Sequence, residues 1–205
     1  YPESCLSADV SPADVKKAIS SETAAVFVTA IDYYGGKCRL AEIKREIGGI
    51  PLLADNAHGA YLAFCGEHPN SVADMVCDSA HKTLPVLTGG AYLHINNPVF
   101  FPRAKEMTAL FGSTSPSYLI LESLDLCNRF LAESNTIAKA TENVISLKST
   151  LIKAGFTLSE SDEMRVCIDA AAYGYYGTEL ADEMRAKGAE CEFADKKFCV
   201  LLFSK

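Results

Sequence analysis

The sequence lacks the features that mark several classes of proteins. Its 205 residues contain no cluster of Lys or Arg, and the formal net charge is -7, so the basic footprint of a nucleic-acid-binding protein is missing. No apolar run reaches the roughly 20 residues of a membrane-spanning helix. Residues 1–4 are neither basic nor followed by an apolar stretch, which argues against a signal peptide. We therefore expect no nucleic-acid partner and no membrane partner.

Paired cysteines are also missing. The eight cysteines are scattered singly, without a CxxC pair, in a chain too long to need disulfides for stability. Cys77, Cys167 and Cys199 lie in apolar stretches, where Cys behaves as a small hydrophobic residue. We therefore expect reduced thiols and a cytoplasmic protein. What is present is an ordinary globular composition, 49% hydrophobic and 22% charged, which suffices for a core.

The first half of the chain alternates helical patterns with short apolar runs. Ser11-Pro12 begins a helical stretch that reaches Ser20, and Leu40–Ile47 has helical spacing that Gly48-Gly49 ends. Strands are expected over residues 24–29, where a continuous apolar run indicates burial on both faces, and over 50–55, 73–78 and 90–95. This alternation predicts parallel pairing in an α/β domain.

The second half predicts a different architecture. Residues 117–153 have the pattern of one long helix, or of two helices with a break. Strands are expected over 165–171, 190–193 and 198–203, with a helix over 178–187, which together indicate an α+β arrangement. We therefore expect a large α/β domain over residues 1–153, which includes the linking helix, and a small α+β domain over 154–205. The pattern opens and closes abruptly, so we expect missing material at both ends.

Two short segments carry the chemistry, and each follows a predicted strand. They are Asp55-Asn56-Ala57-His58-Gly59 and Ser79-Ala80-His81-Lys82-Thr83-Leu84-Pro85. In parallel sheets, ligand-binding residues collect beyond the carboxyl ends of the strands. Desolvation in a cleft favours the neutral amine of a lysine, which is the form that attacks a carbonyl carbon. Lys82 is therefore the candidate to bind pyridoxal 5′-phosphate (PLP), and the Asp55 carboxylate is the candidate to keep the pyridine nitrogen protonated.

The two segments resemble the D-x-A-H-G and S-x-H-K-T-L-P motifs of the prokaryotic ornithine/lysine/arginine decarboxylase family, which belongs to fold-type I of PLP-dependent enzymes. The resemblance runs from near Thr29 to the end of the chain. Further matching segments are residues 87–91, 113–118, 174–180 and 191–195. The resemblance implies the aspartate-aminotransferase-like fold, here as part of the large domain and the start of the small one.

The family resemblance also assigns roles to individual residues. Lys82 forms the Schiff base with the cofactor, Asp55 pairs with the pyridinium nitrogen, and His58 approaches the phenolic oxygen of the ring. The other cofactor-binding residues are Ala57, which packs on the ring, and Ser79 and His81, which contact the phosphate. The loop at residues 113–115 reaches the cofactor of a partner subunit, which implies a homodimer or a higher homo-oligomer.

The sequence departs from the family pattern in two respects. Position 56 is Asn where the family often has Glu, which we expect to be tolerated. The family's Gly/Ser/Thr-rich phosphate-binding loop and the His that stacks on the ring should precede Tyr1, so we expect the chain to be a fragment that lacks the N-terminal part of the large domain.

Ordinary structural roles remain open for each candidate residue. Asp55 sits where an Asp commonly caps a helix, and Ser79 could be a simple turn or cap residue. His58 and His81 could be satisfied histidines of the core or of a turn. His68 and His94 have no functional context in the sequence, so they are assigned structural roles and no metal site is expected. Arg165 is interpreted as structural rather than as a ligand of a substrate carboxylate.

Three functions compete at this stage. The leading hypothesis is an enzyme, a PLP-dependent decarboxylase that converts arginine, lysine or ornithine to the corresponding amine and carbon dioxide. The first alternative is another fold-type I reaction, catalysed by an aminotransferase or a different lyase, since one fold hosts many chemistries. The second is a truncated paralogue without catalytic activity.

Overall fold

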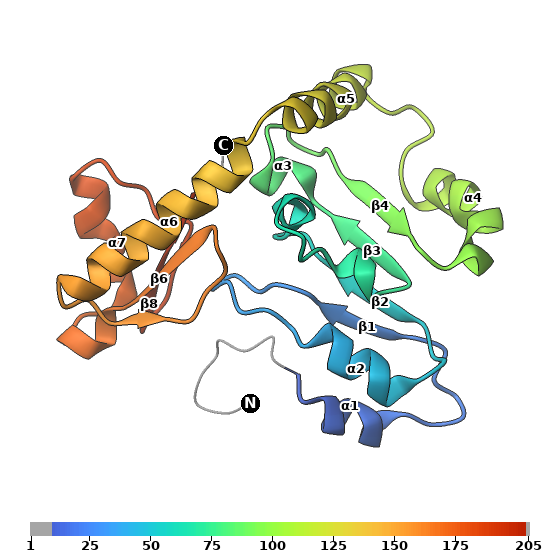
Figure 1. The fold of residues 1–205 in the computed structure, drawn as a ribbon, viewed down its shortest axis with the longest axis horizontal. Helices are drawn as coiled ribbons and strands as arrows, with labels where there is room; N and C mark the ends of the chain where they lie inside the picture. The colour runs from blue at the N-terminus through green and yellow to red at the C-terminus, as the bar shows by residue number, and fades with distance from the viewer. Residues whose placement is uncertain (1–9, 204–205) are drawn as a thin grey trace. The chain divides into compact units, whose positions relative to one another are not determined.

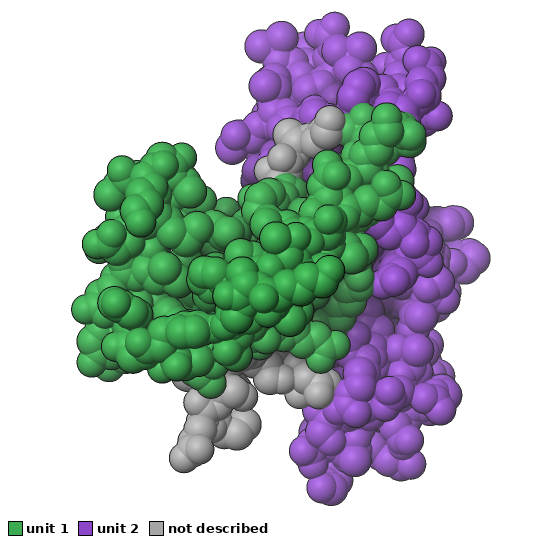
Figure 2. All heavy atoms as spheres, turned by 60° about the vertical axis from the view of Figure 1, so that its left-hand side comes forward, with its two compact units in different colours: residues 1–7, 32–37, 135–204 green, residues 8–31, 38–134, 205 purple. Residues whose placement is uncertain are grey.

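A computed structural model describes residues 10–203 and divides them into two compact units (Figure 2). The N-terminal unit comprises residues 10–31 and Cys38–Ser134, and the C-terminal unit comprises Asp32–Lys37 and the chain from Asn135 onward. The N-terminal residues 1–4 and Cys5 lie outside the described residues.

A four-stranded sheet forms the centre of the N-terminal unit, with the order β1-β2-β3-β4 (Figure 1). The strands are β1 (Val26–Thr29), β2 (Leu52–Asp55), β3 (Met75–Asp78) and β4 (Tyr92–Ile95). The first three pair in parallel, as predicted, and Asp55 lies in register with Cys77 of the next strand. The carboxyl ends of β2 and β3 therefore meet at one edge of the sheet.

Two helices cover one face of this sheet. Helix α1 (Pro12–Ala18) has Ser11 at its N-cap position and Pro at its first position, as the sequence predicts. Helix α2 (Leu40–Ile47) has the predicted bounds and ends at Gly48, whose φ of 60° suits a residue without a Cβ atom. Its side chains Leu40, Ile43 and Ile47 share one helical face and are buried with Leu52 and Val76. The burial of each such side chain contributes about 2 kcal/mol to the stability of the folded protein.

Strand β4 runs antiparallel to β3, so the prediction of parallel pairing is wrong for this strand. The connection contains α3, which spans only Ala80–Thr83. A parallel crossover needs a segment that returns the chain along the whole strand, usually a helix, and a single helical turn is too short for this. The motif containing Lys82 therefore lies directly after β3, in the connection between two antiparallel strands.

The second face of the sheet is less covered than the sequence suggested. Phe27 of β1 is 68% exposed and Leu93 of β4 is 52% exposed. The apolar run at residues 24–29 had indicated a strand buried on both faces, and this expectation is wrong for Phe27. Within residues 10–203, packing covers mainly the face that carries Val28, Leu52 and Val76.

The remaining elements of the N-terminal unit are 3-10 turns and helices. The turns are η1 (Ala60–Phe64), η2 (Pro69–Ser71) and η3 (Pro98–Phe100), and the helices are α4 (Phe101–Phe111) and α5 (Tyr118–Glu133). Helix α6 (Thr136–Lys153) begins after a break at Ser134-Asn135. The stretch predicted over 117–153 is therefore two helices, one of the two possibilities left open by the sequence.

The C-terminal unit contains a second four-stranded sheet, which is entirely antiparallel and has the order β5-β6-β8-β7. Its strands are β5 (Leu158–Ser159), β6 (Arg165–Asp169), β7 (Phe193–Ala194) and β8 (Phe198–Leu202), and the turn η4 (Ala170–Tyr173) and helix α7 (Gly177–Ala186) complete it. Val144 of α6 and Leu180 of α7 pack with Val166 and Ile168 of the sheet. The predicted α+β arrangement is thus observed.

The segment Asp32–Lys37, distant in sequence, also belongs to the C-terminal unit. The Tyr34 hydroxyl donates a hydrogen bond of 2.8 Å to Asp195 Oδ2, and Lys37 forms a 2.7 Å ion pair with Glu163. The contacts also group α6 with this unit rather than with the residues before it. As a statement about separately folding domains, the division into 1–153 and 154–205 stays a prediction.

No helix within residues 10–203 combines the length and the apolar character needed to cross a membrane.

Candidate active site

The first half of the candidate site is the turn that follows β2. Asp55 ends the strand, and its Oδ1 accepts a hydrogen bond of 3.0 Å from the backbone N–H of Ala57. The backbone N–H of Asn56 donates to the carbonyl of Cys77, and that of Gly59 donates to the carbonyl of Asn56. These bonds turn the chain sharply and hold the Asp55 carboxylate beside the backbone of its own turn, an arrangement that also occurs in ordinary Asx turns.

Gly59 is required by the close packing of this turn. A Cβ atom at this position would lie 2.2 Å from Asn56 Oδ1 and 2.9 Å from Ile31 Cδ1. The backbone conformation does not require glycine here, because a φ of -122° is open to any residue. Glycine is required instead because the turn has no room for a Cβ atom. The turn places the His58 side chain in a buried position, with 6% of the residue exposed.

The second half of the site follows β3 and meets the first half directly. Lys82 lies in the single turn of α3, and its Nζ is 3.2 Å from His58 Nε2. An ammonium group only donates hydrogen bonds, so His58 Nε2 accepts and Nδ1 carries the proton of the neutral ring. The structure thus brings together Lys82 and His58, two residues that the sequence placed in one site. Both lie in the same compact unit.

Ser79 and His81 flank the same turn. Ser79 occupies the N-cap position of α3, but its side chain makes no capping hydrogen bond. His81 Nδ1 lies 3.1 Å from the carbonyl oxygen of Gly90. Because a carbonyl oxygen only accepts, His81 Nδ1 must carry a proton, and Nε2 of the neutral ring is then an acceptor. A bound phosphate would therefore receive a hydrogen bond from His81 only if the ring were protonated on both nitrogens.

Two buried polar atoms beside the motif residues have no hydrogen-bond partner among the described residues. They are Asn56 Oδ1 and Thr83 Oγ1. Asn56 is fully buried and Thr83 is 1% exposed. Buried polar atoms are nearly always satisfied in folded proteins, so their presence fits a site that receives a polar group. A lysine amine and a carboxylate, such as Lys82 and Asp55 offer here, are groups that PLP chemistry uses.

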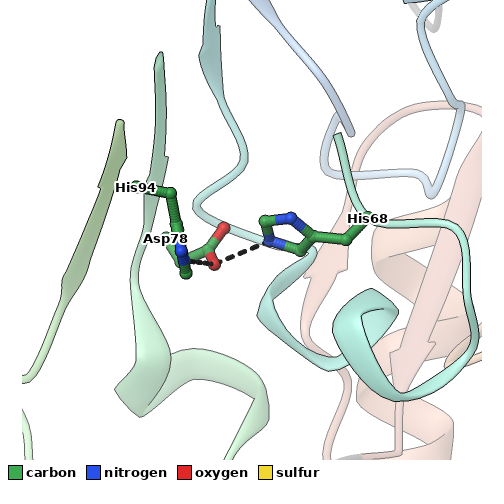
Figure 3. A group of neighbouring side chains, drawn as sticks. All are labelled: His68, Asp78 and His94. Carbon is green, nitrogen blue, oxygen red and sulfur yellow. Dashed lines mark hydrogen bonds and ion pairs between the residues drawn. The ribbon is translucent and has the colours of Figure 1, made fainter. Parts of the chain in front are cut away.

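Asp78, the residue directly before the second motif, is at the centre of a cluster with His68 and His94 (Figure 3). Asp78 Oδ2 accepts hydrogen bonds of 2.8 Å from Nε2 of both His68 and His94. Its other oxygen accepts a bond of 2.7 Å from Asn56 Nδ2. Burial alone would raise the pKa of Asp78, but the hydrogen bonds from His68 and His94 outweigh it and lower the pKa to about 2. The Asn56–Asp78 bond ties the turn after β2 to the end of β3.

Two imidazoles and a carboxylate are also ligand types that hold a metal ion, but the hydrogen bonds argue for another role here. His68 Nδ1 accepts a 3.2 Å hydrogen bond from the backbone N–H of Asn70, so the neutral His68 ring carries its proton on Nε2. If a metal ion bound Nε2, the proton of the neutral ring would have to be on Nδ1. Two hydrogen-bond donors, Nδ1–H and the backbone N–H of Asn70, would then face each other. The cluster is therefore a network of N–H groups around one carboxylate.

The Asp78 network was missed by the sequence analysis. His68 and His94 had been interpreted as structural, and the structure shows that both rings bond to Asp78. A signal was present, since the Asn at position 56 departs from the Glu expected there. A carboxylate at position 56 would face the carboxylate of Asp78, whereas the amide donates to it. Arg165 is fully buried and paired with Asp162, which fits its structural interpretation.

Comparisons with known proteins agree on one family. Residues 2–175 match the family described as "Orn/Lys/Arg decarboxylase, major domain". The Bacillus subtilis protein YaaO, itself uncharacterized, is 35% identical over 149 residues, which cover 66% of this chain and 31% of that protein. An arginine decarboxylase of Bacillus cereus is 31% identical over 144 residues, with the same two coverages. The chain thus spans about a third of the length of these relatives.

Solved structures share the fold. The lysine decarboxylase LdcF of Francisella novicida superposes with a TM-score of 0.72 at 19% identity, over 87% of this chain and 33% of that one. A NifS-like protein superposes with a TM-score of 0.65 at 13% identity, over 96% of this chain and 60% of that one. The predicted fold class, the α/β fold of type I PLP-dependent enzymes, is confirmed.

Proposed function

This chain belongs to the Orn/Lys/Arg decarboxylase family, and on that basis we propose that it serves the PLP-dependent decarboxylation of a basic amino acid. The substrate class is arginine, lysine or ornithine, and the products are the corresponding amine and carbon dioxide. The observation that carries the proposal is the 3.2 Å contact between Lys82 Nζ and His58 Nε2. It joins the two motifs at the carboxyl ends of adjacent parallel strands, where α/β proteins bind their ligands.

Individual residues of the two motifs have distinct roles in this proposal. Lys82 would supply the amine that holds the cofactor, and His58 Nε2, 3.2 Å from this amine, would accept its proton. Asp55 supplies the carboxylate that keeps a ring nitrogen protonated, while Ala57 packs against the ring. Once bound, PLP supplies the electron sink for the electron pair left when carbon dioxide departs.

Ser79 and His81 are the proposed phosphate contacts. The Ser79 hydroxyl is not used as a helix cap, so it can donate to a phosphate oxygen. His81 reaches an anion only with a proton on Nε2, because Nδ1 already donates to Gly90.

The proposal includes a homodimer or a higher homo-oligomer in the cytoplasm. The end of α4 and the start of α5 expose several large apolar side chains on either side of the Ser113–Ser115 loop. These are Leu110, Phe111, Tyr118 and Leu119, of which Phe111 is 81% and Tyr118 is 85% exposed. Exposed apolar groups of this kind commonly mark interaction surfaces, and a second copy of the chain is the occupant that the family resemblance implies.

Product analysis tests the proposed reaction. The protein is supplied with PLP and with each basic amino acid carrying a labelled carboxyl carbon. We expect labelled carbon dioxide and a matching amine from one substrate, and a loss of at least about 100-fold in turnover for Asp55→Asn with PLP still bound. A keto acid or ammonia as the product would assign a different PLP reaction. PLP binding without any conversion would assign the chain to a non-catalytic role.

A further inference from the structure

Two cysteine thiols touch one another in the C-terminal unit, far in sequence from the PLP motifs. Cys191 Sγ lies 3.2 Å from Cys199 Sγ. Cys191 precedes β7, and Cys199 lies within β8. The sulfur of Met184, on helix α7, is 3.9 Å from Cys191 Sγ. The sequence had suggested singly scattered cysteines, but folding places these two in direct contact.

The β7–β8 hairpin holds the two sulfur atoms together. Ala194 pairs in register with Cys199, and Asp195 Oδ1 accepts the backbone N–H groups of Lys197 and Phe198 in the turn, both at 2.7 Å. An S–S bond is about 2.04 Å long, so the sulfur atoms would have to approach each other by about 1.2 Å. Side-chain rotation can supply a movement of this size while the hairpin keeps its register.

The two thiols differ in their access to solvent. Cys191 is partly exposed, whereas Cys199 is fully buried. Burial and then the hydrogen bond with Cys191 raise the pKa of Cys199 to about 12. Oxidants from solution therefore reach Cys191 first, whereas Cys199 stays a protonated thiol. Cys199 is the second partner because its sulfur already lies 3.2 Å from that of Cys191.

We propose that Cys191 and Cys199 are a peroxide-sensitive pair that forms a reversible disulfide within the folded chain. In the first step the Cys191 thiol loses its proton and its sulfur attacks one oxygen of hydrogen peroxide; the O–O bond breaks, and the departing hydroxide takes up that proton, so the products are a sulfenic acid and water. In the second step Cys199 sulfur attacks the sulfenic sulfur, and the hydroxyl group leaves as a second water with the thiol proton. In total, two thiols and one peroxide give one disulfide and two waters.

The consequence is a covalent link between β7 and β8 that closes a short loop of chain. Such a link limits the fraying of a two-residue strand and of the hairpin that carries Asp195, the acceptor of the Tyr34 hydroxyl. This inference concerns the C-terminal unit and does not depend on PLP binding or on decarboxylation.

Mass spectrometry of the intact protein provides the test. The reduced protein is freed of reductant, treated with hydrogen peroxide and alkylated. The expected result is a loss of two hydrogen atoms and two fewer alkylated thiols than in the untreated protein, reversed by dithiothreitol, with a Cys191–Cys199 linked peptide in the digest. Cys191→Ser should abolish the link. Cys77→Ser, which removes an exposed thiol on β3, should leave it unchanged.

Circular dichroism of the variants before oxidation ensures that only folded proteins are compared. The proposal is overturned if peroxide leaves the thiol count of the folded protein unchanged. It is equally overturned if Cys191 is converted to sulfinic acid without a linked peptide, or if the linked peptide joins a different pair of cysteines.

Discussion

Asp78 is the residue on which the local structure of the candidate site depends. Its buried carboxylate receives N–H groups from His68, His94 and Asn56, and through Asn56 it fixes the turn that carries Asp55 and His58. The pKa of Asp78 in the folded state, about 2, is below its ordinary value of 3.8. A carboxyl group with a depressed folded-state pKa stabilises the protein above its unfolded pKa and loses that contribution as the pH falls.

The pH dependence of stability follows from this shift. A difference of almost two pKa units corresponds to about 2 kcal/mol, fully present above pH 3.8 and lost as the pH falls toward 2. Asp78→Asn should lower the free energy of unfolding by about 2 kcal/mol near neutral pH, because two imidazole N–H groups lose a charged acceptor. Urea denaturation at several pH values measures both effects. Asp125→Asn, at an exposed position on α5, should change neither, and an equal loss there would contradict the assignment.

The pair formed by Asn56 and Asp78 makes a second prediction at this scale. Asn56→Asp places a second buried carboxylate about 2.7 Å from Asp78 Oδ1, as judged from the present amide contact, and two carboxylates at that distance repel. We expect a loss of about 3 kcal/mol at neutral pH, partly regained as the pH is lowered. The double variant Asn56→Asp/Asp78→Asn restores one amide and one carboxylate, so its loss should be smaller than the sum of the two single losses. Strict additivity would show that the two side chains do not interact.

At the residue scale the sequence predicted two motif residues that the structure brings into contact, but not the Asp78 network beside them. Lys82 and His58 were predicted because each belongs to a short motif, and the structure brings them into contact. The roles assigned to Asp55, Ala57, Ser79 and His81 stay predictions. The Asp78 network joins residues 10, 16 and 22 positions apart in sequence. Apart from the unusual Asn at position 56, no local pattern indicates that three such side chains meet around one carboxylate.

At the scale of elements, the turn after β2 is fixed by the absence of a side chain at its end. Gly59→Ala would place a methyl group 2.2 Å from Asn56 Oδ1 and 2.9 Å from Ile31 Cδ1, so these buried side chains or the turn itself must move. We expect a loss of about 2 kcal/mol in the free energy of unfolding. Gly49→Ala is the matched control, because an added Cβ there meets nothing within 4 Å. Chemical denaturation of both variants decides the matter, and equal stability of the two would refute the packing argument.

Helices were easier to predict than strand directions. The bounds of α2 follow from three apolar residues on one face and a glycine that ends the helix, both of which are local signals. The antiparallel direction of β4 depends on the path of the chain between β3 and β4, where α3 is only one turn long. The sequence shows the length of this connection but not its path. Helix α4 (Phe101–Phe111) was not predicted at all, and its residues are mostly exposed, so it lacks the buried stripe by which helices are recognised.

At the scale of the whole molecule, the division of the chain does not follow sequence order. The loop Asp32–Lys37 joins the C-terminal unit through Tyr34 and Lys37. The sequence does not reveal this assignment, because hydrogen bonds between residues more than a hundred positions apart leave no periodic pattern.

Oligomerisation is the prediction that belongs to this scale. Leu119 is 68% exposed and belongs to the apolar segment formed by the end of α4 and the start of α5. If that segment is the interface between two copies, Leu119→Glu should shift the protein from dimer to monomer in size-exclusion chromatography with light scattering, since a buried unpaired charge costs several kcal/mol. Ile152→Glu, at a residue 59% exposed on α6, should leave the mass unchanged. A Leu119→Glu protein that remains fully dimeric would place the interface elsewhere.

The account rests on the covalent attachment of PLP to one amine, and one measurement tests this directly. The protein is incubated with PLP, freed of the excess, reduced with borohydride and digested for peptide mass spectrometry. We predict that the reduced cofactor is attached to the peptide containing Lys82. Replacement of this lysine by Arg should remove the label, and Lys105→Arg, at an exposed lysine on α4, should keep it. A label on other lysines, or one that persists in folded Lys82→Arg protein, would contradict the assignment.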